Sequence, residues 1–261
     1  MVMKVIHAIT VVLLSLTLCQ AQNSIAPKGA PDDAYTRRSV HLLTGLQRNP
    51  WQGWKAGTIV VVRYLGDADP VAKPFANVQP DMVYQILEAD KLFTRTQMVK
   101  GKPIRQDFLV KDQVGIEAAS LVAKDTGATD IELDGFVLTS LLSISLMREI
   151  PGGSWTTKEW SLASHPSILL RQEVNGVGWS VTSARALKKI GEREFPCVEI
   201  KKRMRIYSGG QMDVLTTQYL SPHVPGHLVE EIQEFFKVGK KQERPTPYMV
   251  IHQKVVEVKI Q

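Results

Sequence analysis

Residues 167–183 read SILLRQEVNGVGWSVTS, and this stretch decides the fold. Asn175-Gly176 lies at its centre, and this dipeptide between apolar residues is the strongest short-range signal for a two-residue β-hairpin turn. After the turn, apolar residues alternate with small or polar ones, which directs one face of the strand inward. The alternating apolar residues are Val177, Trp179 and Val181. The stretch therefore predicts two antiparallel strands, 167–174 and 177–183.

The chain that follows continues the same pattern. Residues 197–207 alternate between an apolar face, with Val198, Ile200, Met204 and Ile206, and a charged face, with Glu199, Lys201, Arg203 and Arg205. Further strands are predicted at 212–220, 228–238 and 248–260, with a charged loop before the last. Successive hairpins with few convincing helices predict an antiparallel, mostly-β architecture.

The chain before the hairpin is more mixed. Asp32-Asp33 are suitable N-cap residues for a short amphipathic helix at 34–46, which Asn49-Pro50 ends. The remaining predictions are strands at 57–65, 82–89, 92–99 and 104–111, a second short helix at 116–124, and an apolar segment at 136–147 that fits either strand or helix.

The first 21 residues have the layout of a secretory signal peptide. A single Lys4 precedes an apolar run over 8–18, and Cys19-Gln20-Ala21 forms a small-x-small cleavage site. The run is too short for a membrane anchor, which needs about 20 apolar residues. A lipoprotein is the closer alternative, but Leu18 stands where a small residue usually precedes the lipidated cysteine.

The predicted organisation is therefore a signal peptide at 1–21, a disordered tail at 22–31 and a single mostly-β domain at 32–261. Segment 113–134 is an alternative boundary between two smaller β units. Whether Cys19 is ever lipidated stays open.

Composition narrows the class of protein. After the leader only Cys197 remains, so an internal disulfide is excluded, and the chain has no Asn-x-Ser/Thr glycosylation site. Both absences favour a bacterial exported protein, periplasmic or extracellular. The formal net charge of +6 suits an anionic envelope surface and is too weak to argue for nucleic acid.

Two segments resemble a family of uncharacterised bacterial exported β-rich proteins. They are residues 190–198 (IGEREFPCV) and 216–229 (TTQYLSPHVPGHLV), and Trp51-x-x-Trp54-Lys55-x-Gly57 is similar to the start of such chains. These proteins in turn resemble the periplasmic lipoprotein-carrier half-barrels. The resemblance implies a curved antiparallel sheet or half-barrel around an apolar cavity plugged by helices. It brings no catalytic residue.

The residues offer little catalytic chemistry. Cys197 lies on a predicted strand among acidic neighbours, so a buried structural thiol explains it. The prolines and Gly226 around His223 and His227 disfavour the helix on which two histidines four apart would share a metal. Asp130, Glu132 and Asp134 alternate and can share one strand face, but a solvated loop or edge strand explains them too. Gly-x-Ser-x-Gly, Ser-x-x-Lys and phosphate-binding glycine motifs are absent. We therefore expect no enzyme, cofactor or metal, although a carboxylate or metal hydrolase is a third possibility.

We expect a non-enzymatic envelope protein that binds or carries a lipid or other apolar ligand, with at most peripheral membrane contact. Alternating apolar faces would supply the wall, and basic side chains would meet an anionic headgroup. The candidate ligand-binding residues are Trp54, Trp179, Lys201, Arg203 and Arg205. The alternative is a structural or protein-interaction module of the envelope, with another envelope protein as partner and no small-molecule ligand.

Overall fold

The computed structural model of the protein describes residues 33–65, 81–99, 101–116, 131–134, 136–138, 141–150, 153–175, 177–206, 212–237, 247 and 249–261. The predicted signal peptide, the predicted tail and nearly all of the predicted second helix lie outside the described residues. The same holds for residues 66–80 and 238–246.

Strands dominate the described chain. One α-helix, α2 (Asp33–Gln47), precedes them, and a 3-10 turn, η2 (Val110–Asp112), interrupts them. The strands are β1 (Ile59–Tyr64), β2 (Met82–Glu88), β3 (Leu92–Val99), β4 (Lys102–Leu109), β5 (Ile131–Leu133), β6 (Phe136–Leu138), β7 (Leu141–Ile150), β8 (Gly153–Leu162), β9 (His165–Val174), β10 (Val177–Ile190), β11 (Arg193–Ile206), β12 (Met212–Leu220), β13 (Leu228–Lys237) and β14 (Met249–Lys259).

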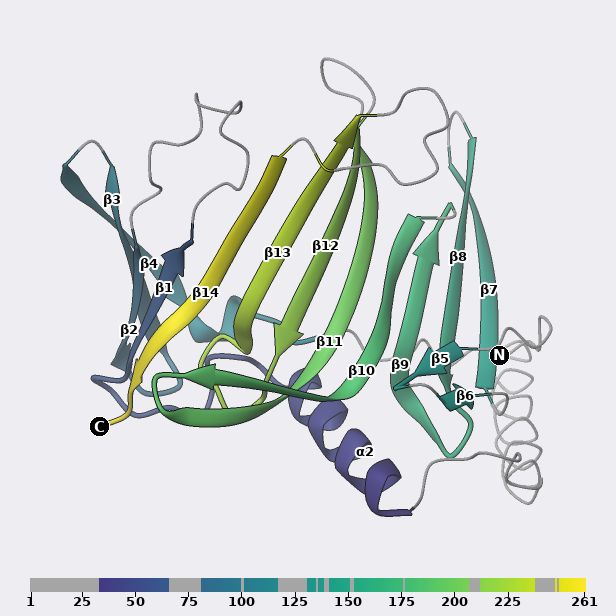
Figure 1. Ribbon diagram of the computed structural model, residues 1–261, viewed down its shortest axis with the longest axis horizontal. Helices are drawn as coiled ribbons and strands as arrows, with labels where there is room; N and C mark the ends of the chain where they lie inside the picture. Colours follow the sequence, from purple (N-terminus) through teal and green to yellow (C-terminus); the bar gives the residue numbers. More distant parts are fainter. Residues whose placement is uncertain are drawn as a thin grey trace, which may run out of the picture.

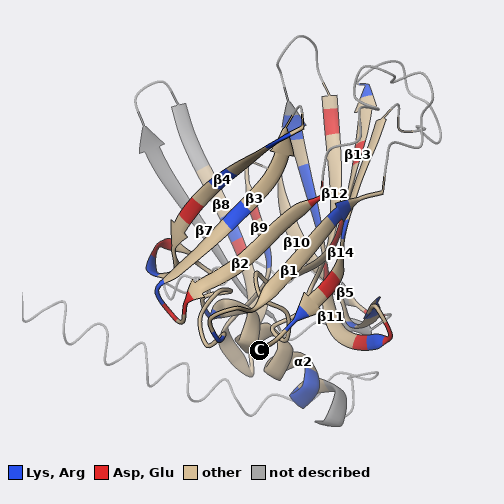
Figure 2. Ribbon diagram, turned by 90° about the vertical axis from the view of Figure 1, so that its left-hand side faces the viewer, with Lys and Arg blue, Asp and Glu red and all other residues tan. Residues whose placement is uncertain are grey.

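Twelve of these strands form one antiparallel sheet in the order β4-β3-β2-β1-β14-β13-β12-β11-β10-β9-β8-β7. The sheet is curved and does not close on itself (Figures 1 and 2). Strands β5 and β6 form a separate two-stranded sheet. The predicted mostly-β, antiparallel curved sheet is thereby confirmed. Segment 136–147, which the sequence left open, forms β6 and most of β7 and is therefore strand.

The sheet consists of two meanders joined at one place. Strands β1 to β4 follow one another in space as in sequence, and so do β7 to β14. The join is the antiparallel pair β1–β14, which runs from Ile59 opposite Lys259 to Tyr64 opposite Gln253. Strands from both sides of segment 113–134 therefore belong to one sheet.

The predicted hairpin with its turn at Asn175 is present. Val174 pairs with Val177 across the turn, and Asn175 has a φ of 52°, as a tight hairpin turn requires. Strands β10 and β11 are longer than predicted. The prediction missed their ends, which meet at Gly191-Glu192, because these ends carry many charged residues and lack apolar alternation. Register shifts between Val181 and Ala186 bend this long hairpin.

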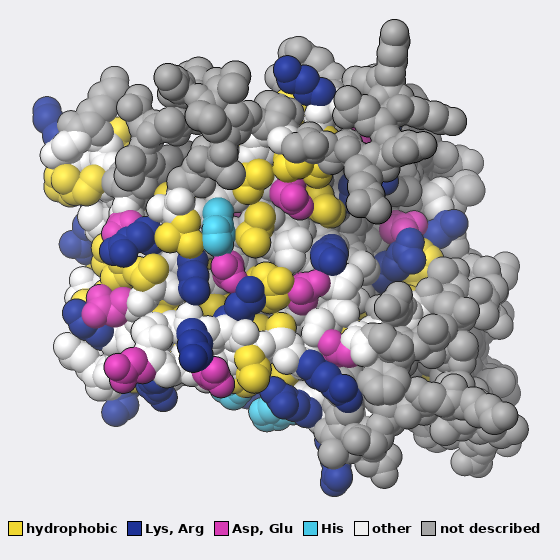
Figure 3. Space-filling view, in the orientation of Figure 1, with side chains coloured by type: hydrophobic (Ala, Val, Ile, Leu, Met, Phe, Trp, Pro, Cys, Tyr) yellow, Lys and Arg dark blue, Asp and Glu magenta, His cyan; other side chains and the backbone are white. Residues whose placement is uncertain are grey.

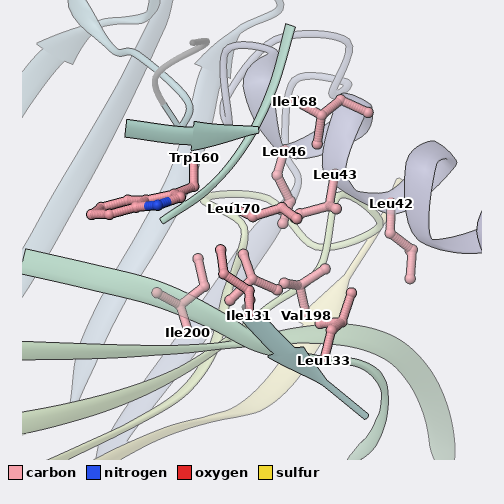
Figure 4. Close-up of a cluster of buried hydrophobic side chains, with 11 residues drawn as sticks. Leu42, Leu43, Leu46, Ile131, Leu133, Trp160, Ile168, Leu170, Val198 and Ile200 are labelled. Carbon is pink, nitrogen blue, oxygen red and sulfur yellow. The ribbon is translucent and has the colours of Figure 1, made fainter. Parts of the chain in front are cut away.

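A buried cluster joins α2 to the inner wall of the sheet. Leu43 and Leu46 point from the helix toward Leu170 of β9 (Figure 4). The helix contacts β9, β10 and β11. The other fully buried wall residues of the cluster include Ile168, Val181, Val198 and Ile200. We call the sheet face that carries Ile200 the concave face and the opposite face the convex face.

The short span between Leu46 and Trp51 shows which way the sheet curves. Leu46 packs in the cluster of β9–β11, whereas Trp51 stacks on Phe93 of β3, with ring centroids 4.1 Å apart. Five residues reach at most about 18 Å, but β3 and β11 lie six strand spacings apart, roughly 29 Å along the sheet. The sheet must therefore curve around this segment, on its concave side.

The concave face of the curved sheet forms a trough. Three segments lie at one end of it, and we call them the plug: residues 46–54, 113–116 and 221–227. The Ile116 N–H donates to the Leu46 carbonyl at 2.9 Å, and the Gly226 N–H donates to the Pro50 carbonyl at 2.9 Å. Trp51 anchors the plug, since it also lies 5.2 Å from the Tyr84 ring. These bonds join the helix end to loops distant in sequence.

The tip of the β10–β11 hairpin folds over the convex face. Lys188 Nζ lies 2.5 Å from Glu230 Oε2 and 3.4 Å from the centre of the Tyr219 ring. His252 Nε2 is 2.8 Å from the other Glu230 oxygen. Burial would raise the pKa of Glu230, but its bonds to Lys188 and His252 outweigh this and lower the pKa. The hairpin tip is thus held by an ion pair.

Candidate functional site

A cavity of about 320 Å³ lies between the concave face and the plug. The sheet supplies Gln172, Trp179, Ile200, Lys202 and Leu220. The plug supplies Pro50, residues 114–116, Gly226 and His227. The cavity therefore has an apolar wall of three large side chains, with polar groups beside it.

Strand register explains why these wall residues share a face. Trp179 of β10 pairs with Gln172 of β9 on one side and with Lys202 of β11 on the other. Ile200 lies two residues before Lys202 on the same strand, and side chains two apart point to the same face. The unbroken β11–β12 register continues this face, with Lys202 opposite Thr216.

Lys202 is the cationic group of the cavity. Within the described part of the chain, its ammonium makes no hydrogen bond or ion pair. Desolvation by the surrounding wall lowers the pKa of Lys202, and the charge of Glu231 partly offsets this effect. The residue is nevertheless exposed, so solvent and ligands can reach it.

The predicted basic residues Lys201, Arg203 and Arg205 lie on the convex face, directed away from the cavity. Each has an acidic partner. Lys201 Nζ is 3.5 Å from Glu199 Oε1, and both arginines bind Asp213, at 2.9 and 2.7 Å. Hydrogen bonds from Arg205 and Arg203 lower the pKa of Asp213 to about 2. Figure 3 likewise shows basic and acidic side chains interspersed over the surface rather than gathered by sign.

Of the two predicted tryptophans, the structure brings one to the cavity. Trp179 lines it, half-buried, beside Lys202. Trp54 lies in the plug, where its Nε1–H donates to the Pro50 carbonyl at 3.3 Å. It lines a second hollow of about 390 Å³ on the far side of the plug, together with His41 and His223.

Two buried carboxylates lie on the concave face near the cavity, and glutamine amides satisfy them. Glu231 accepts hydrogen bonds from Gln233 and Gln253, both at 2.7 Å, and a third from Gln218. Glu159 accepts one from Gln172 at 3.2 Å. These neutral amide donors stabilise the two carboxylates. Neither carboxylate forms an ion pair with Lys202.

His227 separates the two hollows and lines both. It is 7% exposed and has a φ of 60°. Burial lowers its pKa to about 4, so the ring is neutral near pH 7. Its buried position was not predicted, because the sequence indicated only a polar turn.

The remaining candidate groups have structural environments. Cys197 is fully buried, and its Sγ–H donates to the Phe195 carbonyl at 3.3 Å. The Asp134 carboxylate accepts from the Ser183 hydroxyl and, at 2.9 Å, from the Ala184 N–H. Asp130 and the side chain of Glu132 lie outside the described residues. Among the described residues, no group of three or more potential ligands could hold a metal ion.

Comparison with family models, curated proteins and solved structures finds no match for this chain. Among the helices that the structure describes, none is both long and apolar enough to cross a membrane. Lys202 is therefore the main addition to the predicted site. Its position on the same strand face as Ile200 and Met204 was the signal that could have identified it.

Proposed function

We propose that this protein is an exported, non-enzymatic binding or carrier protein of the bacterial envelope that holds a lipid or other apolar ligand against its concave face. One observation carries the proposal. A cavity of about 320 Å³, walled by Trp179, Ile200 and Leu220, lies between the curved sheet and the plug. Its volume is at the lower end of the range for small-molecule pockets.

The leader-like residues 1–21 support the placement in the envelope, because they have the charge, apolar core and cleavage pattern of an export signal. The architecture supports the binding role. The sheet is curved and does not close on itself, and the cavity lies between its concave face and the plug.

Native mass spectrometry tests the proposal directly. The full-length chain is expressed with its leader in a bacterial host, purified without detergent and weighed before and after organic extraction. We expect a reproducible bound mass that extraction removes. A clean apo mass, with no uptake of added envelope lipids, would overturn the proposal.

A cavity-filling variant locates the ligand. Leu220→Trp places a larger side chain in the cavity, whereas Leu215→Trp adds the same group on the convex face of the same strand. We expect Leu220→Trp to lose bound lipid and Leu215→Trp to retain it. Equal retention by both folded variants would place the ligand elsewhere.

The alternative, a protein-interaction module without a small ligand, has its own observation. The β3–β4 hairpin forms one edge of the sheet and exposes large apolar side chains. They are Met98, Val99, Ile104 and Leu109, each between 39% and 49% exposed. Exposed apolar groups beside an unpaired edge suit docking of another protein. A clean apo mass would leave this alternative in front.

A further inference from the structure

Lys202 differs from the other basic residues of segment 201–205 on its strand. Lys201, Arg203 and Arg205 lie on the convex face and are neutralised by Glu199 and Asp213. Lys202 alone among them faces the cavity. Segment 201–205 thus presents one cation inward and three paired cations outward.

The two buried carboxylates on the concave face near the cavity already have partners. Glu231 is 7% exposed and accepts three glutamine amides, and Glu159 is 5% exposed and accepts Gln172. No described side chain forms an ion pair with Lys202. Its ammonium group therefore has three donors available for a ligand.

The apolar wall adjoins this free cation. Trp179 is directly opposite Lys202 in the β10–β11 register, and Ile200 is its neighbour on the same strand face. Leu220 completes the wall. Gln218 is opposite Ile200, and Leu220 lies two residues further along the same strand, so it shares that face. A cation beside an apolar wall is complementary to an anionic group attached to a hydrocarbon chain.

We propose that the ligand is an anionic amphiphile, a single acyl chain bearing a carboxylate or phosphate, and that Lys202 binds its anionic group while Trp179, Ile200 and Leu220 contact the chain. This inference rests on the proposed function and adds the chemical class of the ligand. The lowered pKa of Lys202 agrees with it, since a bound anion would compensate the ammonium for lost solvation.

Isothermal titration with three amphiphiles of equal chain length tests the inference. A fatty acid carries a carboxylate, a lysophosphatidic acid carries a phosphate, and a monoacylglycerol carries no charge. We expect the wild-type protein to bind at least one anionic amphiphile about tenfold more tightly than the neutral one. The stronger of the two anionic ligands identifies the headgroup.

Variants of adjacent residues separate charge from packing. Lys202→Gln should abolish the anionic preference, so that the fatty acid and the lysophosphatidic acid bind no more tightly than the monoacylglycerol. Lys202→Glu should reverse the preference toward an alkyl ammonium of the same length. Lys201→Gln, on the opposite face, should bind like the wild type. Circular dichroism and urea unfolding confirm that the variants fold.

The outcomes distinguish the two proposals. If the wild type binds charged and neutral amphiphiles equally, or if Lys202→Gln keeps the anionic preference, the Lys202 inference is overturned and the carrier function stands. If the wild type binds none of the three and carries no extractable mass, the carrier function and the inference fall together.

Discussion

Gly226 packs directly against the indole of Trp51. A β-carbon at residue 226 would lie 2.8 Å from Trp51 Cζ2, and the indole cannot move aside because it is stacked on Phe93. Gly226 also has a φ of 81°, in the left-handed region. With the Gly226 N–H to Pro50 hydrogen bond, this contact joins the 221–227 turn to the segment that follows the helix.

Gly226→Ala should therefore destabilise the protein by strain and by a clash. The left-handed conformation costs an alanine about 1 kcal/mol, and overpacking adds about 1–3 kcal/mol. Gly53→Ala is the matched control, because Gly53 has a φ of 82° with nothing within 4 Å of the added carbon. Urea unfolding should show a larger loss for Gly226→Ala; equal losses would refute the clash.

His227 should make stability depend on pH. Its pKa is about 4 in the folded state against 6.5 ordinarily, so the unfolded chain binds more protons between these values and stability falls as the pH falls. The loss reaches about 2 kcal/mol by pH 5. His227→Asn, which suits a positive φ, should flatten the urea-unfolding profile between pH 7 and 5. His223→Asn, at an exposed site, should keep the wild-type slope.

Cys197 should be unreactive in the native protein. Burial raises its thiol pKa to about 12, so about one molecule in ten thousand carries the thiolate at pH 8. Iodoacetamide should leave the Cys197 peptide unmodified in buffer and alkylate it in urea. Rapid native labelling, measured by peptide mass spectrometry, would show that the hairpin tip opens.

Replacing Asp134 should lower the stability of the protein, although this residue lies beside a strand of only three residues. Its carboxylate binds Ser183 and the Ala184 N–H where the β10–β11 register is interrupted, and its own N–H donates to Thr182. Asp134→Ala leaves these donors without their acceptor and should cost about 1–3 kcal/mol. Asp134→Asn keeps an acceptor and should cost less. Identical thermal midpoints for wild type and Asp134→Ala would contradict the assignment.

Local patterns predicted the sheet well where alternation was clear. The strand at Leu92–Val99 and the Asn175 hairpin follow from alternation and turn chemistry within a few residues. The extensions of β10 and β11 could not be predicted from local patterns. Their ends bend over the convex face and are stabilised by the ion pair between Lys188 and Glu230, which are distant in sequence. Pairing between charges far apart leaves no local pattern.

The site was harder to predict than the fold. Trp179 was identified from alternation alone. Lys201, Arg203 and Arg205 were grouped by charge, and charge on one strand face does not show whether partners neutralise it. The sequence distinguishes Lys202 from them only by its position two residues after Ile200, which places both side chains on the same strand face. The cavity itself depends on the plug, which brings together three segments far apart in sequence.

The single join between the two meanders has a consequence for synthesis. Strand β1 leaves the ribosome long before its neighbour β14, and at 5–20 residues per second the delay is on the order of tens of seconds. Throughout that interval the nascent chain exposes the unpaired apolar edge Ile59–Val62, a template for pairing with other chains. Association with other chains through this edge is therefore a hazard until β14 pairs with β1.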